Sequence, residues 1–160
     1  MRRVAATLAV AVALLFSAGS ARADHYSQLR QAHESGDYAT ALQEWRPLAE
    51  QGHAKAQNNP GNMYYNGYGV PKDYAGAVKW YRMATEQGDA DAQFNLGNMY
   101  AKGQGVPTNN VKAYMWWSLS KAQGAEDVAT NLDIVQNRMT TTDIAKARAL
   151  AAEWREKHNN

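Results

Sequence analysis

Two stretches of the sequence, AQNNPGNMYYNGYGVP at residues 56–71 and AQFNLGNMYAKGQGVP at residues 92–107, are nearly the same and lie 36 residues apart. When residues 54–89 are aligned with residues 90–125, 16 of the 36 positions are identical. Self-similarity at a fixed period is the signature of a repeat architecture, in which each unit buries its apolar face against its neighbours. The sequence therefore predicts a short solenoid.

Each unit has the pattern of two helices. Small residues and an aromatic recur at helical spacing up to Gly67, which is expected to end the first helix in the left-handed conformation. Pro71 breaks the chain, and Asp73, or Asn109 in the second copy, is expected to be the N-cap of the next helix. This second helix is predicted from about Tyr74 to Gln87.

The period continues outside the two full copies. The segment DYATALQEWRPLAEQG at residues 37–52 precedes its counterpart DYAGAVKWYRMATEQG at residues 73–88. We predict an all-α chain, an α/α solenoid of antiparallel pairs with about eight helices, whose end units deviate so that they stay soluble. The predicted parts are an N-terminal helix pair (24–53, with helices at 25–35 and 38–51), two repeats (54–89 and 90–125) and a C-terminal capping helix pair (126–160) joined near residues 140–142.

The first 23 residues have the features of a cleavable signal peptide. Arg2 and Arg3 precede an apolar run over residues 4–16, and Ala21 and Ala23 form a small-x-small cleavage pattern. The apolar run is shorter than the roughly 20 residues that cross a bilayer. We therefore expect export to the periplasm or beyond, with no membrane span in the mature chain.

Removal of this segment changes the charge argument. It takes away Arg2, Arg3 and Arg22 but no acidic residue, so the formal net charge of +2 becomes −1. An apparent basic bias disappears, and with it any charge-based argument for nucleic acid or an anionic membrane as partner. The chain has no cysteine, so apolar burial rather than disulfides must hold the exported domain together.

The repeated pattern AQ-x-N-L-G-x-MY-x-x-G-x-GVP, followed by A-x-x-W and QG, resembles the Sel-1-like repeat, a relative of the tetratricopeptide repeat. The resemblance accounts for nearly all of the chain from about Asp37 to Trp154. It implies an α-solenoid of exported bacterial type that acts as an adaptor or scaffold in protein–protein contacts, is not an enzyme and needs no cofactor. With two full repeats the groove is short, so homo-oligomerisation is one way to reach a useful contact area.

The resemblance also implies where a partner binds. In tetratricopeptide arrays the first helix of each repeat lines a concave groove, and the same register positions are expected to contact the partner here. Asparagines would offer amide donors and acceptors to a peptide backbone, and aromatics would offer apolar contact. The groove residues implied in this way are Lys55, Asn58, Asn62, Tyr65, Asn66, Asp91, Phe94, Asn98, Ala101 and Lys102.

Pro60 departs from the repeat pattern, which has Leu96 at the equivalent position. A proline inside a helix removes a backbone hydrogen bond and costs on the order of 3 kcal/mol. The first helix is predicted either to continue with a kink, which we favour, or to begin late with Asn59 as its N-cap. Pro47 raises the same question, and a kinked or shortened helix is predicted there.

The aromatic residues follow the period. Trp45, Trp80 and Trp116 are predicted to be equivalent core positions, as are Tyr64 and Tyr100, while the placement of Tyr114 and Trp117 stays open.

Other functions have weaker sequence support. A cell-wall module that binds peptidoglycan or a β-lactam-like ligand is the main alternative, because asparagines and aromatics also pack on sugars and amides. Ser118 and Lys121 match S-x-x-K, but the S-D-N and K-T-G elements of penicillin-recognising enzymes are missing. No metal site is predicted, because the chain has no cysteine and its histidines are not spaced to bind one metal ion together. The four histidines are His25, His33, His53 and His158.

Overall fold

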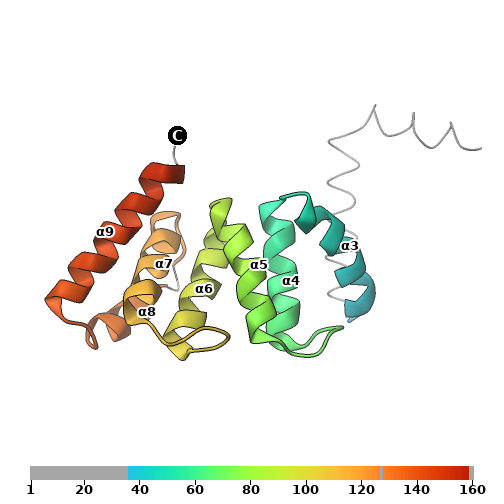
Figure 1. Cartoon of the computed structure of the whole chain (residues 1–160), viewed down its shortest axis with the longest axis horizontal. Helices are drawn as coiled ribbons and strands as arrows, with labels where there is room; N and C mark the ends of the chain where they lie inside the picture. The colour runs from blue at the N-terminus through green and yellow to red at the C-terminus, as the bar shows by residue number, and fades with distance from the viewer. Residues whose placement is uncertain (1–35, 127, 159–160) are drawn as a thin grey trace, which may run out of the picture. The chain divides into compact units, whose positions relative to one another are not determined.

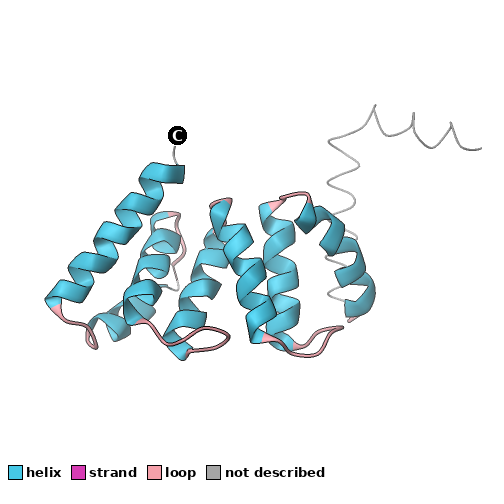
Figure 2. Cartoon of the chain, in the orientation of Figure 1, coloured by secondary structure: helices cyan, strands magenta, loops and turns pink. Residues whose placement is uncertain are grey.

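Helices follow one another along the part of the chain that the structure, a computed structural model, describes: residues 36–126 and 128–158, without the side chain of Lys55. Loops join these helices, and no strand occurs in those residues (Figure 2). The predicted signal peptide and the predicted helix at 25–35 lie outside the described residues. The helices are α3 (Tyr38–Glu50), α4 (Ala54–Asn66), α5 (Tyr74–Glu86), α6 (Ala90–Lys102), α7 (Asn110–Ala122), α8 (Val128–Gln136) and α9 (Thr141–His158).

Residues 38–158 form the predicted all-α solenoid. Each helix from α3 to α7 packs against the next one in the chain, and Figure 1 shows them in chain order. The first helices of the two repeats, α4 and α6, begin and end at residues 36 positions apart, and so do the second helices, α5 and α7. None of the helices in this described part is both long and apolar enough to cross a membrane.

Glycines end the first helix of each repeat. Gly67 and Gly103 are left-handed, with φ of 77° and 67°, and their N–H groups donate to the carbonyls of Met63 and Met99. The left-handed conformation carries little penalty for glycine, since it has no Cβ. These glycine-terminated helices confirm the boundary expected from the repeated glycines.

A glycine inside each first helix faces an aromatic ring of the following helix. A Cβ atom on Gly61 would lie 2.5 Å from Cε1 of Tyr81, and one on Gly97 would lie 2.5 Å from Cδ1 of Trp117. Both rings are buried, with 2% and 5% of their surface exposed. Each repeat therefore brings its two helices together through a contact that leaves no room for a larger residue than glycine.

Two further contacts recur between successive units. Arg46 donates to the hydroxyl of Tyr64 at 3.0 Å, and one period later Arg82 donates to the hydroxyl of Tyr100 at the same distance. The loop between α6 and α7 also lies against the start of α5, where a Cβ on Gly105 would collide with the backbone. The second helix of one unit is therefore held to the first helix and the loop of the next.

The C-terminal helices form at the predicted places but pack differently from the repeats. Thr140 and Asp143 make a reciprocal cap before α9, in which the Asp143 amide donates to the Thr140 hydroxyl at 3.1 Å. Both α8 and α9 contact α7, whereas direct contacts between α8 and α9 are few. Ala147 and Ala151 are the buried residues of α9, and the larger Ile144 and Trp154 also pack on its neighbours.

The predicted equivalence of Trp45 with Trp80 and Trp116 is wrong, whereas Trp80 and Trp116 are one period apart as predicted. A shift of 36 residues aligns Trp45 with Tyr81 and Trp117, and these three residues are the buried ones. Trp80 and Trp116 are half-buried. The error has a physical origin: a ring one position along a helix points about 100° away, so equal residue type does not replace equal register.

Tyr100 is buried as predicted, while its counterpart Tyr64 is only half-buried. Tyr114, whose placement the sequence leaves open, is buried, with 7% of its surface exposed.

Pro60 lies within α4, which is continuous from Ala54 to Asn66. The alternative of a late start after Asn59 is therefore wrong. Pro60 is fully buried, like Leu96 at the same position of α6. Pro47 likewise lies within α3 and does not shorten it, because α3 is 13 residues long, the same length as each helix of the two repeats.

We expect Gly97→Ala to lower the free energy of unfolding by about 1–3 kcal/mol, because the added methyl group would overlap the Trp117 ring. Gly76→Ala in α5 is the matched control: its methyl group would meet the mobile carboxylate of Asp73, and alanine favours helix by about 1 kcal/mol. Urea unfolding of both variants measures the difference. Equal stability of the two variants would contradict the proposed contact.

Pro60→Leu is expected to stabilise the domain by about 1–3 kcal/mol, because leucine restores the backbone donor that proline lacks and fits the equivalent site in α6. Hydrogen exchange of α4 amides should slow relative to α6 in the same variant. A loss of stability would mean that the site around residue 60 has a different shape from the site around Leu96.

Candidate functional site

A small hollow opens between the first helices of the two repeats. It has a volume of about 190 Å³, and α4, α5 and α6 contribute its walls. We term it the asparagine hollow, because most of its polar side chains are carboxamides. Its lining residues are Asn62, Tyr65, Asn66, Tyr81, Asn95, Asn98 and Met99.

Four of the groove residues implied by the sequence meet in this hollow: Asn62, Tyr65, Asn66 and Asn98. The others lie apart from it. Asn58 is buried, Phe94 and Ala101 pack against the core, and Asp91 and Lys102 are exposed near the two ends of α6. The side chain of Lys55 lies outside the described residues. Partner contact by any of these residues stays a prediction.

Asn62 already has a structural role. Its Oδ1 accepts a hydrogen bond from the Tyr81 hydroxyl at 2.7 Å and another from Nδ2 of Asn95 at 3.2 Å. The same Nδ2 of Asn95 also lies 3.2 Å from Oδ1 of Asn58. These bonds tie both α5 and α6 to α4, so the asparagine row joins the two repeats as well as lining the hollow.

Burial keeps Tyr81 in its neutral form. It raises the pKa of the phenol well above its ordinary value of 10, and the neighbouring Tyr65 acts in the same direction. The hydroxyl thus remains a donor to Asn62 across the whole physiological pH range. The hollow consequently has a fixed hydrogen-bonded floor.

Other polar groups of the hollow are not used by the fold. The Asn98 carboxamide and the Tyr65 hydroxyl have no hydrogen-bond partner among the described residues, and Asn66 uses only its Nδ2, which donates to the Asn62 carbonyl at 2.9 Å. Tyr65 is held in place by packing on the Tyr74 ring, with ring centroids 5.4 Å apart. The hollow therefore presents free donors and acceptors beside an aromatic ring.

Comparison with known proteins identifies the repeats. Residues 54–89 and 90–124 each match the Sel1 repeat family. The chain thus contains two Sel1-like repeats. The resemblance predicted from the sequence is thereby confirmed, and Sel1 repeats are generally scaffolds for protein–protein interaction and typically not enzymes.

Solved structures support the same family. A protective antigen of uropathogenic Escherichia coli strains with an SLR fold is 29% identical, with a TM-score of 0.77 over 87% of this chain and 31% of its own. A Sel1 repeat protein from Oxalobacter formigenes is also 29% identical, with a TM-score of 0.65 over 79% of this chain and 54% of its own. The present chain thus spans about a third and about half of these two proteins. No curated protein matches it.

Sequence reasoning about this Sel1-like repeat protein missed three residues of the hollow, Tyr81, Asn95 and Met99. Asn95 is the counterpart of Asn59, and this identity between the two copies was the available signal. Trp45 and Trp117 stand at the positions equivalent to Tyr81, and an aromatic residue at all three positions indicates a buried ring. The hydrogen bond from the Tyr81 hydroxyl to Asn62, however, could not be predicted from the sequence.

The residues of the proposed alternative chemistries do not form a site. No hydrogen bond or ion pair links Ser118 to Lys121 in the described part of the chain, and Lys121 is exposed. Among the described residues, no three histidine or acidic side chains are grouped closely enough to hold a metal ion. His25 and His33 lie outside the described residues.

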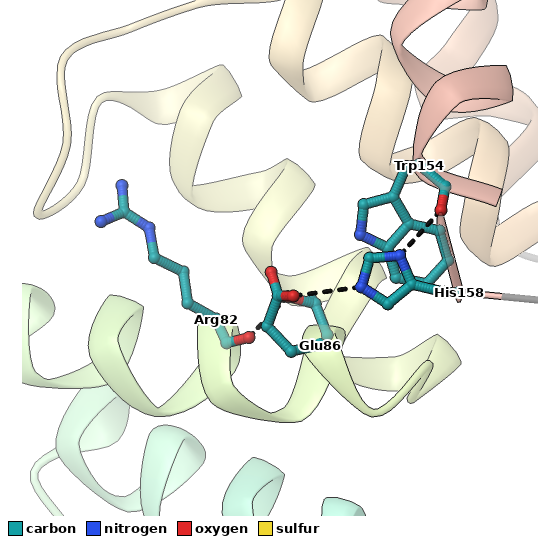
Figure 3. A network of polar contacts seen from close by, with 5 residues as sticks. Arg82, Glu86, Trp154 and His158 are labelled. Carbon is teal, nitrogen blue, oxygen red and sulfur yellow. Dashed lines mark hydrogen bonds and ion pairs between the residues drawn. The ribbon is translucent and has the colours of Figure 1, made fainter. Parts of the chain in front are cut away.

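A second polar cluster of the Sel1-like repeat protein lies at the C-terminal ends of α5 and α9. Nδ1 of His158 is 2.7 Å from the Trp154 carbonyl, and its Nε2 is 3.1 Å from Oε2 of Glu86 (Figure 3). Both partners are acceptors, so the doubly protonated imidazole satisfies both. The hydrogen bond to the Trp154 carbonyl, followed by the one to Glu86, raises the pKa of His158 above its ordinary 6.5, against the opposing effects of desolvation and, less strongly, of the Lys157 charge.

We expect a pKa of His158 above 6.5 in the folded protein, measured from the pH dependence of its imidazole carbon protons by NMR. The stabilisation from this cluster should be complete below pH 6.5 and fall as the pH rises through the folded pKa. Glu86→Gln should lower the pKa only in part, because the bond to the Trp154 carbonyl remains. A folded pKa at or below 6.5 would contradict the cluster.

Proposed function

We propose that this protein is a non-enzymatic adaptor of the bacterial cell envelope that binds a segment of another protein across the first helices of its repeats. The observation that carries the proposal is the asparagine hollow, where Asn98, Asn66 and Tyr65 present polar atoms that the fold leaves unused. An extended backbone offers alternating N–H donors and carbonyl acceptors, and a carboxamide can accept from the first and donate to the second.

The size of the hollow favours a protein partner over a small ligand. Small-molecule sites usually enclose about 300–1,000 Å³, whereas the asparagine hollow has about 190 Å³. A partner that lies across α4 and α6 would place one side chain or one peptide group in it. Asp91 and Lys102, exposed near the two ends of α6 and outside the hollow, would add charged contacts of opposite sign along the same helix.

The tryptophans argue against a carbohydrate platform. Such platforms need exposed aromatic faces, and all five tryptophans are buried or half-buried: Trp45, Trp80, Trp116, Trp117 and Trp154. The tryptophans therefore give the cell-wall alternative no support.

The location in the envelope rests on the sequence of residues 1–23. A basic start, an apolar run and a small-x-small end favour export. Because the protein has no cysteine, export to an oxidising compartment needs no disulfide pairing.

The test is crosslinking and affinity purification of the full chain from the periplasm, with wild type compared with Tyr65→Phe/Asn98→Ala. This pair removes one hydroxyl and one carboxamide that have no partner in the described fold, so the fold should persist. We expect capture of a specific protein to fall at least about fivefold, the loss typical of a residue worth more than 1 kcal/mol at an interface.

Asn137→Ala is the matched control, because Asn137 is exposed in the turn after α8, far along the chain from the hollow. It should capture the same protein as the wild type. Equal capture by all three chains would exclude the hollow as the binding surface. Recovery of wall fragments without any protein would favour the cell-wall alternative instead.

A further inference from the structure

A larger cavity lies where the second helices of the repeats end. It has a volume of about 570 Å³, within the range of small-molecule sites, and belongs to α5, α7 and α9 rather than to the asparagine hollow. We term it the helix-end cavity. The lining residues used below are Glu86, Gln87, Leu119, Trp154, Arg155 and His158, together with Ala122.

The period explains why the cavity exists. Glu86, Ala122 and His158 are 36 residues apart, and each is the last residue of its helix. Alanine in the middle position leaves an empty space between the two longer side chains. Nε2 of His158 lies 3.1 Å from Oε2 of Glu86, and both residues line the cavity (Figure 3).

The charges of the cavity leave one cation without a partner. Glu86 is engaged by His158, whereas the guanidinium of Arg155 has no ion pair or hydrogen bond within the described residues. At the C-terminal ends of α5 and α7, the amides of Gly88 and Gly124 donate to the carbonyls of Thr85 and Lys121. Arg155 is therefore the charged side chain of the wall that is left for a ligand.

The remaining wall combines apolar surface with unused donors. Leu119 is buried, with 3% of its surface exposed, and lies beside Ala122 and the Trp154 ring. The carboxamide of Gln87 has no partner among the described residues. A ligand that fits this wall has an anionic group for Arg155 and Gln87 and a short apolar group for Leu119 and Ala122.

Trp154 adds a second reason to expect an acceptor. Its indole nitrogen is buried without a hydrogen-bond partner, and His158 stacks on the indole with centroids 4.0 Å apart. A buried donor left unpaired is unfavourable. A carboxylate oxygen that enters beside Arg155 and shifts the stacked imidazole would pair with this N–H.

We propose that the helix-end cavity binds a carboxylate attached to a short aliphatic group, with Arg155 as the anchor and Leu119 and Ala122 as the apolar floor. A cationic ligand fits poorly, because Arg155 repels it and the carboxylate of Glu86 is already taken. The carboxylate has two sources of identical chemistry, a free aliphatic acid or the C-terminus of a peptide. The site is independent of the function proposed for the asparagine hollow.

The test is a titration of the full chain followed in ¹H–¹⁵N spectra at the indole N–H of Trp154, identified by its absence in Trp154→Phe. The probes are N-acetyl-leucine, the tripeptide N-acetyl-Gly-Gly-Leu and the uncharged N-acetyl-leucinamide. We expect the resonance to move to saturation with at least one carboxylate and the amide to bind at least about tenfold more weakly. Tighter binding of the tripeptide assigns the site to peptide C-termini, and tighter binding of the single residue assigns it to free acids.

Arg155→Gln should weaken carboxylate binding at least about tenfold. Arg148→Gln is the matched control, since Arg148 is exposed on the same helix but does not line the cavity. It should bind like the wild type, and so should Tyr65→Phe/Asn98→Ala. Equal binding of acid and amide, no saturable shift up to roughly 10 mM, or an unaffected Arg155→Gln variant would each overturn the proposal.

Discussion

The close approach of a helix glycine to a buried aromatic ring is the contact on which the other features depend. Gly61 lies against Tyr81 and Gly97 against Trp117, without space for a Cβ atom. This contact sets the separation between the two helices of each repeat. It also fixes where the next repeat begins, so that Asn95 reaches Asn62 at 3.2 Å and the asparagine hollow forms between them.

Repetition builds the scaffold, and departures from repetition build the candidate sites. The Arg46–Tyr64 bond recurs one period later, as identical stacking of units requires. At the ends of the second helices the same period places three different residues, Glu86, Ala122 and His158, in equivalent positions. The small residue between two large polar ones produces the helix-end cavity, which a strict repeat would not contain.

Much of the fold could be predicted because its signals are local. The glycines after α4 and α6 and the 36-residue spacing predicted the helices and their boundaries closely. An error arose where register mattered, because Trp45 was aligned with the wrong ring. At Pro60 the continuous helix that was favoured is present in α4. Tertiary packing can outweigh the local penalty of a proline.

By itself, the sequence determined the repeat family and the all-α class, because both follow from the 36-residue period and the residues that recur with it. The groove positions came with the family resemblance, and four of the residues implied in this way line the asparagine hollow. Only the tertiary structure decided that Asn62 is bonded to Tyr81 and that His158 meets Glu86, 72 residues away along the chain. Such pairings depend on the angles and distances between packed helices. Those quantities arise from the sum of many side-chain contacts, and no local pattern of residues encodes them.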